Sequence, residues 1–108
     1  MAPIFDTHVH YDDEAFSEDR SEVLTSLKEY GVEKVTDIGA GIASSRTALE
    51  LAQRTPWMYC ALGVIPGQCS EINDETWKWL CSAAENEEKC VAIGEIGLDY
   101  HWDDDPRE

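Results

Sequence analysis

Short apolar runs alternate along the chain with longer stretches in which apolar residues recur every three or four positions. The runs predict β-strands at residues 3–7, 34–38, 57–63 and 90–93. The stretches between them have helical periodicity and predict three α-helices. Strands that alternate with helices at this spacing pair in parallel through right-handed crossovers. The sequence therefore predicts an α/β fold with one parallel sheet and the element order β-α-β-α-β-α-β.

Residues that commonly begin and end helices bound the first two helical stretches. Asp19, with Glu22 three positions later, has the capping-box pattern, and Gly31 is a typical residue just past a helix end. We expect Ser44 or Ser45 to cap the second helix, which ends near residue 54 before the sequence Thr-Pro.

The third helical stretch predicts a helix with Asn73 as its N-cap. Its apolar positions predict one buried stripe, made of Trp77, Leu80, Cys81 and Ala84. Residues 105–108 have the pattern of the opening of a further helix.

The segment Gly39-Ala40-Gly41 lies between a predicted strand and a predicted helix, where the dinucleotide-binding pattern G-x-G-x-x-G would begin. Ser44 stands where that pattern needs its last glycine, so the match is incomplete. We interpret the segment as a tight turn between strand and helix.

Two histidines follow the first apolar run, and a glutamate follows the fourth. Side chains two positions apart in an extended segment share a face, so the imidazoles of His8 and His10 can bind one metal ion. Glu95 lies on a buried strand end, where a carboxylate needs a partner. Taken singly, the histidines also fit a polar strand end and Glu95 fits a structural ion pair; together the three favour a metal site.

The three candidate ligands come from the first and the last predicted strands. Ligands bind parallel sheets at the carboxyl ends of the strands, which is where all three lie. Only a sheet that curls brings such distant strands together, so this pattern favours a barrel. Asp6 and Asp99 are candidates to orient a ligand. Asp6 also fits a solvated strand end, and Asp99 fits a helix cap or a loop ion pair equally well. We interpret His101 as a loop residue.

Composition narrows the function further. The net charge of −15 argues against a basic groove for nucleic acid but is compatible with divalent cations and a metal-bridged phosphate. The four cysteines form no Cys-x-x-Cys pair, so we expect reduced thiols. No apolar run approaches the roughly 20 residues of a membrane span. We therefore expect a cytoplasmic protein that does not interact with membranes.

Four segments together resemble the TatD family of metal-dependent deoxyribonucleases. They are FDTHVH at 5–10, DDEAF at 12–16, GVIP at 63–66 and AIGEIGLDY at 92–100. The resemblance covers the whole chain, and its specific part is GEIGLDY, because His-x-His occurs widely among metal-dependent hydrolases. It implies a partial TIM-type (β/α)₈ barrel, with the first four strands and three helices in a single truncated domain at 1–108.

The resemblance also implies an activity and a ligand set. The activity is hydrolysis of phosphodiester bonds in DNA by a metal-activated water, with one or two divalent ions that are often magnesium, and with zinc or manganese as alternatives. His8 and His10 match the first-strand metal ligands. Glu95 matches the catalytic carboxylate that bridges the metals.

The chain departs from the family in two ways. Ile65 stands where members usually carry a histidine near the substrate phosphate, and isoleucine can neither coordinate nor donate a hydrogen bond. The remaining family ligands, two histidines and a late aspartate, have no counterpart, and a whole barrel takes about 250 residues. Because such a half-barrel has two unpaired edges, we expect self-association or a missing C-terminal half-barrel. Two alternatives are a barrel hydrolase acting on amide or ester bonds and a non-catalytic truncated product that only associates.

Overall fold

The computed structural model describes residues 2–101, which form one four-stranded parallel sheet. Its strands are β1 (Ile4–Val9), β2 (Val32–Ile38), β3 (Met58–Leu62) and β4 (Cys90–Ile93). The α-helices are α1 (Arg20–Ser26), α2 (Ile42–Arg54) and α3 (Asp74–Asn86), with short 3-10 helices at Glu14–Phe16, Leu27–Tyr30 and Pro66–Glu71. The strands lie side by side in sequence order, so the predicted α/β fold is confirmed.

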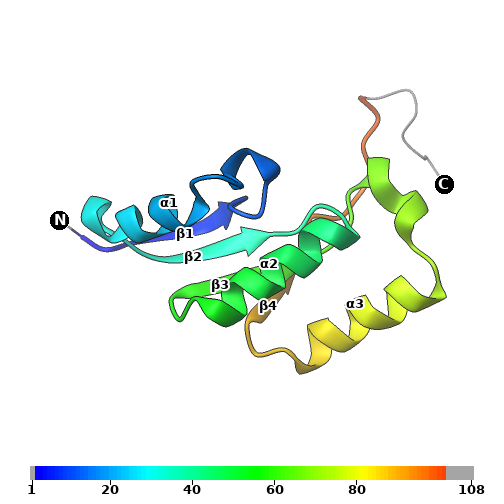
Figure 1. Ribbon diagram of the computed structural model, residues 1–108. Helices are drawn as coiled ribbons and strands as arrows, with labels where there is room; N and C mark the ends of the chain where they lie inside the picture. The colour runs from blue at the N-terminus through cyan, green and yellow to red at the C-terminus, as the bar shows by residue number, and fades with distance from the viewer. Residues whose placement is uncertain (1, 102–108) are drawn as a thin grey trace.

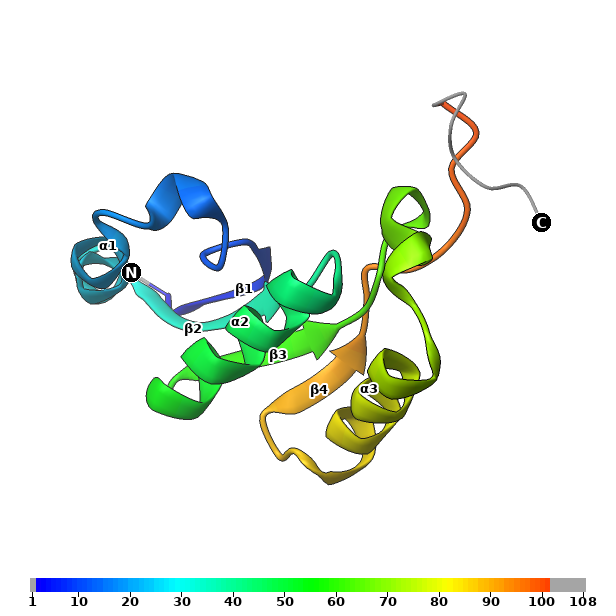
Figure 2. The ribbon, with the colours of Figure 1, turned by 45° about the vertical axis from the view of Figure 1, so that its right-hand side comes forward.

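The helices cross between consecutive strands, as right-handed parallel connections require. Figure 1 shows α2 in front of β2 and β3, and α3 beside β4. In Figure 2 the arrowheads of the strands point toward the same edge, and each strand is rotated relative to its neighbour, so the sheet curves. This edge holds the carboxyl ends of the strands, where the chemistry of a parallel β/α fold is found.

The core lies between the sheet and the helices that cover it. Strands and helices contribute small and branched apolar side chains to one cluster of buried residues: Val9, Val35, Ala48, Leu49, Leu51, Ala52, Met58, Cys60, Leu62, Leu80 and Ala83. The central strands β2 and β3 are therefore held on their helical side by packing, and their carboxyl ends have fixed positions.

The helix boundaries confirm one predicted signal and correct two. Gly31 has a φ of 85° and ends the first helical segment, as predicted. Asp19 precedes α1 but caps nothing with its side chain, because its backbone (φ −123°, ψ 11°) is not extended as an N-cap requires. Helix α2 begins earlier than predicted, after Gly41, since the hydroxyls of Ser44 and Ser45 bind other backbone groups.

Helix α3 begins as predicted but buries a different face. Asn73 caps it and forms a capping box with the residue three positions later. Leu80 is buried as predicted, whereas Trp77 is 55% exposed and Ala83 takes an inward position. The helix is turned in this way because Trp79, half-buried, packs against the core cluster.

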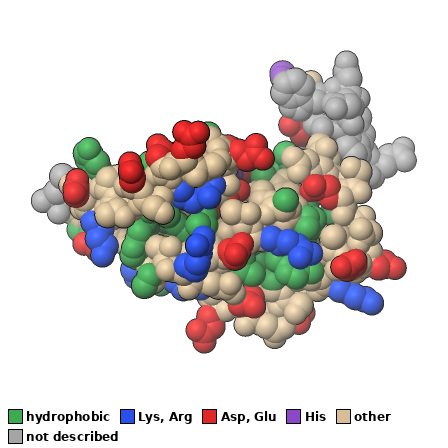
Figure 3. All heavy atoms as spheres, viewed as in Figure 1, with side chains coloured by type: hydrophobic (Ala, Val, Ile, Leu, Met, Phe, Trp, Pro, Cys, Tyr) green, Lys and Arg blue, Asp and Glu red, His purple; other side chains and the backbone are tan. Residues whose placement is uncertain are grey.

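The two edges of the sheet are open, as the sequence predicts. Among residues 2–101, β1 and β4 each have one neighbouring strand. Large apolar side chains on these strands and after β4 are exposed: Ile4, Phe5, Val91, Ile93, Ile96, Leu98 and Tyr100. Acidic side chains are spread over the visible face in Figure 3 and do not gather in one patch. On this face the negative charge is therefore spread over solvated surface.

Three further expectations concern the chain as a whole. All four cysteines carry free thiols, as expected. Within residues 2–101, none of the helices has the length and apolar character needed to cross a bilayer. The helix expected to open at 105–108 lies outside the described residues.

Candidate metal centre

The histidine pair lies at the end of β1. The strand extends to Val9, two residues further than predicted, so His8 is within the strand and His10 directly follows it. The pairing of β1 with β2 is irregular between Asp6 and Val9. The two imidazole rings lie 5.0 Å apart between centroids, at an interplanar angle of 81°. The local backbone therefore brings both rings to the same place, as the spacing predicts.

The segment after β4 reaches across the end of β3. The amide of Gly94 donates to the carbonyl of Leu62 (3.0 Å), and the amide of Glu95 donates to the carbonyl of Gly39 (2.7 Å), after β2. A glycine at position 63 permits this crossing, because a Cβ there would lie 2.5 Å from the Gly94 carbonyl carbon and 2.6 Å from the Glu95 oxygen. The crossing carries Glu95 from the edge of the sheet toward β1.

Ser45 fixes the backbone over which this segment passes. Its hydroxyl donates to the carbonyl of Gly63 (2.9 Å) and accepts from the amide of the same residue (3.1 Å). Ser45 is fully buried, and a Cβ on Gly39 would lie 2.8 Å from its Cα. Two glycines and one serine therefore form a close junction between β2, β3 and α2 beneath Glu95.

The three candidate ligands converge at this edge. Glu95 Oε2 lies 3.7 Å from His8 Nε2 and 3.3 Å from His10 Nε2, and one ligand atom from each residue lies within 4.8 Å of the other two. The side chains are 41%, 56% and 39% exposed for Glu95, His8 and His10. The sheet thus joins residues of its first and last strands; their role as metal ligands stays a prediction.

This donor set fits a divalent ion. Two imidazole nitrogens and one carboxylate oxygen are the three protein ligands of many catalytic zinc sites, which keep a further position open. The partial exposure of all three side chains leaves such a position accessible. The arrangement can therefore hold an ion and present it to a substrate from solvent.

A backbone carbonyl orients the ring of His10. Its Nδ1 lies 2.9 Å from the carbonyl oxygen of Ile38, and since a carbonyl only accepts, Nδ1 carries the proton. The Nε2 lone pair is then directed toward Glu95, as a metal ligand requires. Asp6, a candidate for this orienting role, instead accepts the backbone amide of His8 (3.2 Å) and does not bond to either ring.

The remaining sequence candidates have local contacts. Asp99 accepts the backbone amide of His101 (2.8 Å). This is a contact within the loop, which agrees with the loop alternative considered for Asp99 from the sequence. Ile65 follows β3, and its amide donates to the carbonyl of Ala40 (3.1 Å). At this position the chain contributes a backbone contact and an apolar side chain to the edge that carries the candidate ligands.

Sequence reasoning missed Asp37, the buried acid of β2. This side chain is fully buried and accepts the amide of Tyr11 (2.6 Å), the residue after His10. Burial, reinforced by the neighbouring carboxyl of Asp12, raises the pKa of Asp37 to about 8. Its signal in the sequence is an acidic residue close to the carboxyl end of the predicted strand, in the part of β2 that the structure buries.

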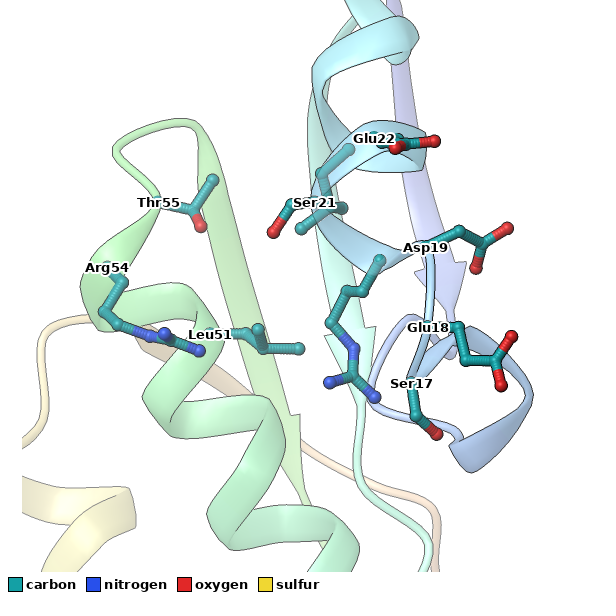
Figure 4. A pocket seen from close by; sticks show the side chains of 10 residues that line it. Ser17, Glu18, Asp19, Ser21, Glu22, Leu51, Arg54 and Thr55 are labelled. Carbon is teal, nitrogen blue, oxygen red and sulfur yellow. The ribbon is translucent and has the colours of Figure 1, made fainter.

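A separate cavity of about 490 Å³ lies away from these residues. The residues that line it are 17–22, Leu24, Leu51, Arg54 and Thr55. Figure 4 shows Leu51 and Arg54 of α2 facing the segment that leads into α1. The cavity contains none of the three candidate ligands, so it is distinct from the candidate metal centre.

A parallel β/α sheet with paired histidines and a glutamate at its carboxyl edge has the arrangement of the metal-dependent barrel hydrolases. The family model described as TatD related DNase matches residues 5–108. The chain belongs to the TatD family.

Similar proteins of known sequence or structure support this family assignment. The metal-dependent hydrolase YabD of Bacillus subtilis, itself described as uncharacterized, is 34% identical over 105 residues, which are 97% of this chain and 41% of YabD. The 3′-5′ ssDNA/RNA exonuclease TatD of Salmonella typhimurium is 33% identical over 98 residues, 91% of this chain and 37% of that protein. The crystal structure of YjjV, a TatD homologue from Escherichia coli, superposes with a TM-score of 0.81 at 35% identity, covering 94% of this chain and 39% of YjjV. The chain thus spans well under half of each relative, which confirms the partial barrel.

Proposed function

We propose that this chain supplies the first metal ligands of a hydrolase that cleaves phosphodiester bonds in DNA. The observation that carries the proposal is the convergence of His8, His10 and Glu95 at the carboxyl edge of the sheet, within 3.3 and 3.7 Å across the two His–Glu pairs. The name of the Salmonella relative, an exonuclease on single-stranded DNA and RNA, supports the substrate class.

Each side chain has a role in this proposal. His8 and His10 would hold an ion through Nε2, and Glu95 would be the catalytic carboxylate and a further ligand. A bound divalent ion would act as a Lewis acid on the phosphoryl oxygen and lower the pKa of a water molecule. The proton on Nδ1 of His10 is held by the carbonyl of Ile38, which keeps Nε2 available.

The identity of the ion is part of the proposal. Magnesium is the ion we propose, with zinc and manganese as alternatives. Imidazole nitrogens suit zinc, whereas carboxylate oxygens suit magnesium and manganese, and this site offers both kinds of donor. Calorimetric titration with each ion separates the three: one binding isotherm that is lost in the double variant His8→Ala, His10→Ala identifies the ion that the site prefers.

The proposal includes the rest of the barrel. A second set of ligands and the open edges of β1 and β4 call for a further half-barrel, supplied by a C-terminal half or by a second copy of this chain. A cytoplasmic location belongs to the proposal as well, because the four cysteines are free thiols.

The test is a nuclease assay with matched histidine variants. The 108-residue chain is incubated with end-labelled single-stranded DNA and magnesium, manganese or zinc, with EDTA as the metal-free arm. We expect slow nucleotide release that needs metal and disappears in His8→Ala, His10→Ala. The control His101→Ala changes the third histidine, which lies outside the cluster, and should retain the activity.

Other outcomes favour the alternatives. Activity on amide or ester substrates without DNA cleavage would favour another barrel hydrolase. A folded chain that binds metal but cleaves nothing would be non-catalytic on its own. DNA cleavage that survives the double histidine variant would come from a contaminating nuclease and would refute the proposed site.

A further inference from the structure

The end of β1 is weakly fixed by its own strand pairing. The strand lies at the sheet edge and pairs only with β2 within the described residues. Its register breaks between Asp6 and Val9, which is the stretch that contains His8. An irregular edge strand can shift along its neighbour, so contacts other than the ladder must place the two histidines.

Two consecutive residues of β2 hold His10 from three directions. Val9, before it, is the ladder partner of Asp37. Tyr11, after it, donates its amide to Oδ1 of the same aspartate at 2.6 Å. The imidazole ring of His10 bonds through Nδ1 to the carbonyl of Ile38 at 2.9 Å. The backbone on both sides of this histidine is therefore tied to one residue, Asp37.

The burial of Asp37 is costly and needs a reason. The side chain is 0% exposed, and its Oδ2 has no hydrogen-bond partner in the described residues, as is also true of Oδ1 of Asp12. A buried carboxyl without a cationic partner is destabilising, and an apolar residue would pack better in this strand. This acid accepts the amide of Tyr11 and interacts with Asp12, and an apolar residue could do neither.

The same segment is held from its other side by Arg20. This guanidinium donates to the carbonyls of Tyr11 (2.6 Å), Asp12 (3.2 Å) and Asp13 (3.1 Å). Arg20 therefore binds the carbonyl side of the turn while Asp37 binds its amide side. A segment held in this way cannot rotate the histidine that precedes it without breaking several hydrogen bonds.

We propose that Asp37 is a positioning residue that fixes the His8–His10 pair by binding the backbone amide of Tyr11 from inside the fold. The inference rests on the proposed metal site, because it assigns to Asp37 the placing of that site's ligands. Without the acceptor at position 37, the end of β1 loses its inner attachment and His10 no longer faces Glu95.

Two substitutions separate the acceptor from the charge. Asn in Asp37→Asn keeps an oxygen for the Tyr11 amide and offers its own amide to the carboxyl of Asp12. Asp37→Leu keeps the branching at Cγ and the number of side-chain heavy atoms but removes the acceptor. Leu80→Ala, on the buried face of α3, is the control for general destabilisation, because it creates a cavity in the core and leaves Asp37 and its acceptor oxygen in place.

The readouts are amide exchange and zinc affinity, both under conditions in which circular dichroism shows each variant folded. In Asp37→Leu we expect the amide of Tyr11 to exchange about tenfold faster relative to the amide of Val35. Zinc affinity, measured by calorimetry, should fall by about 10–100-fold, as for other residues that orient metal ligands. Asp37→Asn should stay within about threefold of the unsubstituted chain in both measurements, and Leu80→Ala likewise.

Three results would overturn the inference. The first is a folded Asp37→Leu chain with unchanged Tyr11 exchange and zinc affinity. The second is an equal loss in Asp37→Asn, which would assign the effect to the carboxyl group itself and not to its accepting oxygen. The third is an equal loss in Leu80→Ala, which would assign it to stability. If the unsubstituted chain binds none of magnesium, manganese and zinc, the proposed function fails, and the exchange of the Tyr11 amide still decides whether Asp37 holds this segment.

Discussion

Replacing Gly63 by alanine tests how the fold places Glu95. The added Cβ would lie 2.5 Å from the carbonyl carbon of Gly94, whereas ordinary contacts begin at 3.4 Å, so about 0.9 Å of movement is needed. Gly63 is not among the described glycines with positive φ, and the effect is therefore steric alone. The perturbation acts directly on the segment that carries the proposed catalytic carboxylate.

Neither of the two backbone segments in this contact can move away without a cost in free energy. The backbone of residue 63 is held by the buried hydroxyl of Ser45, and the segment above it is held by hydrogen bonds to Leu62 and Gly39. Overpacking against backbone of this kind costs about 1–3 kcal/mol, and each kcal/mol lowers the melting temperature of a domain of this size by about 4–8 °C. Metal affinity should fall by about tenfold for each 1.4 kcal/mol that the displaced Glu95 loses at the site.

The assay compares Gly63→Ala with Gly94→Ala. Position 94 belongs to the other partner of the same contact, but a Cβ there meets nothing within 4 Å. The control should therefore unfold within about 0.5 kcal/mol of the unsubstituted chain. Urea unfolding gives the stability of both variants, and calorimetric titration with zinc gives their metal affinity.

Equal stability and equal zinc affinity in Gly63→Ala would refute this account of the crossing. A loss of the same size in Gly94→Ala would refute it too, since it would show that flexibility of the segment, and not the close approach at Gly63, places the carboxylate.

Three further predictions concern pH, capping and association. Because the pKa of Asp37 is raised from 3.8 to about 8, the folded chain binds more protons than the unfolded chain between these values; the free energy of unfolding should fall as pH rises across that range, with a slope that Asp37→Asn lacks in urea titrations. Asn73→Ala removes the capping box of α3 and should cost about 1 kcal/mol in the same titrations, with unchanged zinc affinity. The open edges of β1 and β4 predict sedimentation that depends on concentration, and a monomer with the same sedimentation coefficient at low and high concentration would contradict this.

The fold was predictable because its signals are local. Each strand is a short apolar run and each helix a longer periodic stretch, and the alternation of the two leaves parallel pairing as the natural topology. The details that failed depend on tertiary contacts. Ser44 and Ser45 have the chemistry of helix caps, but their hydroxyls donate to Oδ2 of Asp12 and to the carbonyl of Gly63, 32 and 18 positions away. Their partners lie outside the local pattern, which therefore could not reveal them.

Some residues of the candidate site could likewise be predicted from local sequence, and others depend on tertiary contacts. The spacing of His8 and His10 already places them on one face, and Glu95 belongs to a recognisable segment. Asp37 could not be identified as a site residue from the sequence, because its connection to the site is a hydrogen bond with Tyr11, 26 positions away. An acid in the buried part of a strand is nevertheless unusual, and such a position can be used to look for similar positioning residues.

Most of the contacts that place the site pass through β2, which contributes none of the three candidate ligands. The carbonyl of Ile38 orients His10, Asp37 accepts the amide of the turn after it, and the Glu95 amide donates to Gly39. The last two residues of β2 and the residue after them therefore position both halves of the ligand set. Strand β2 has neighbours on both sides and belongs to the core, whereas β1 and β4 are open edges. Because the ligands on the edges are tied to this interior strand, the geometry of the centre depends on the packed part of the sheet. The three side chains can therefore remain together even where the edges that carry them have no further strand to pair with.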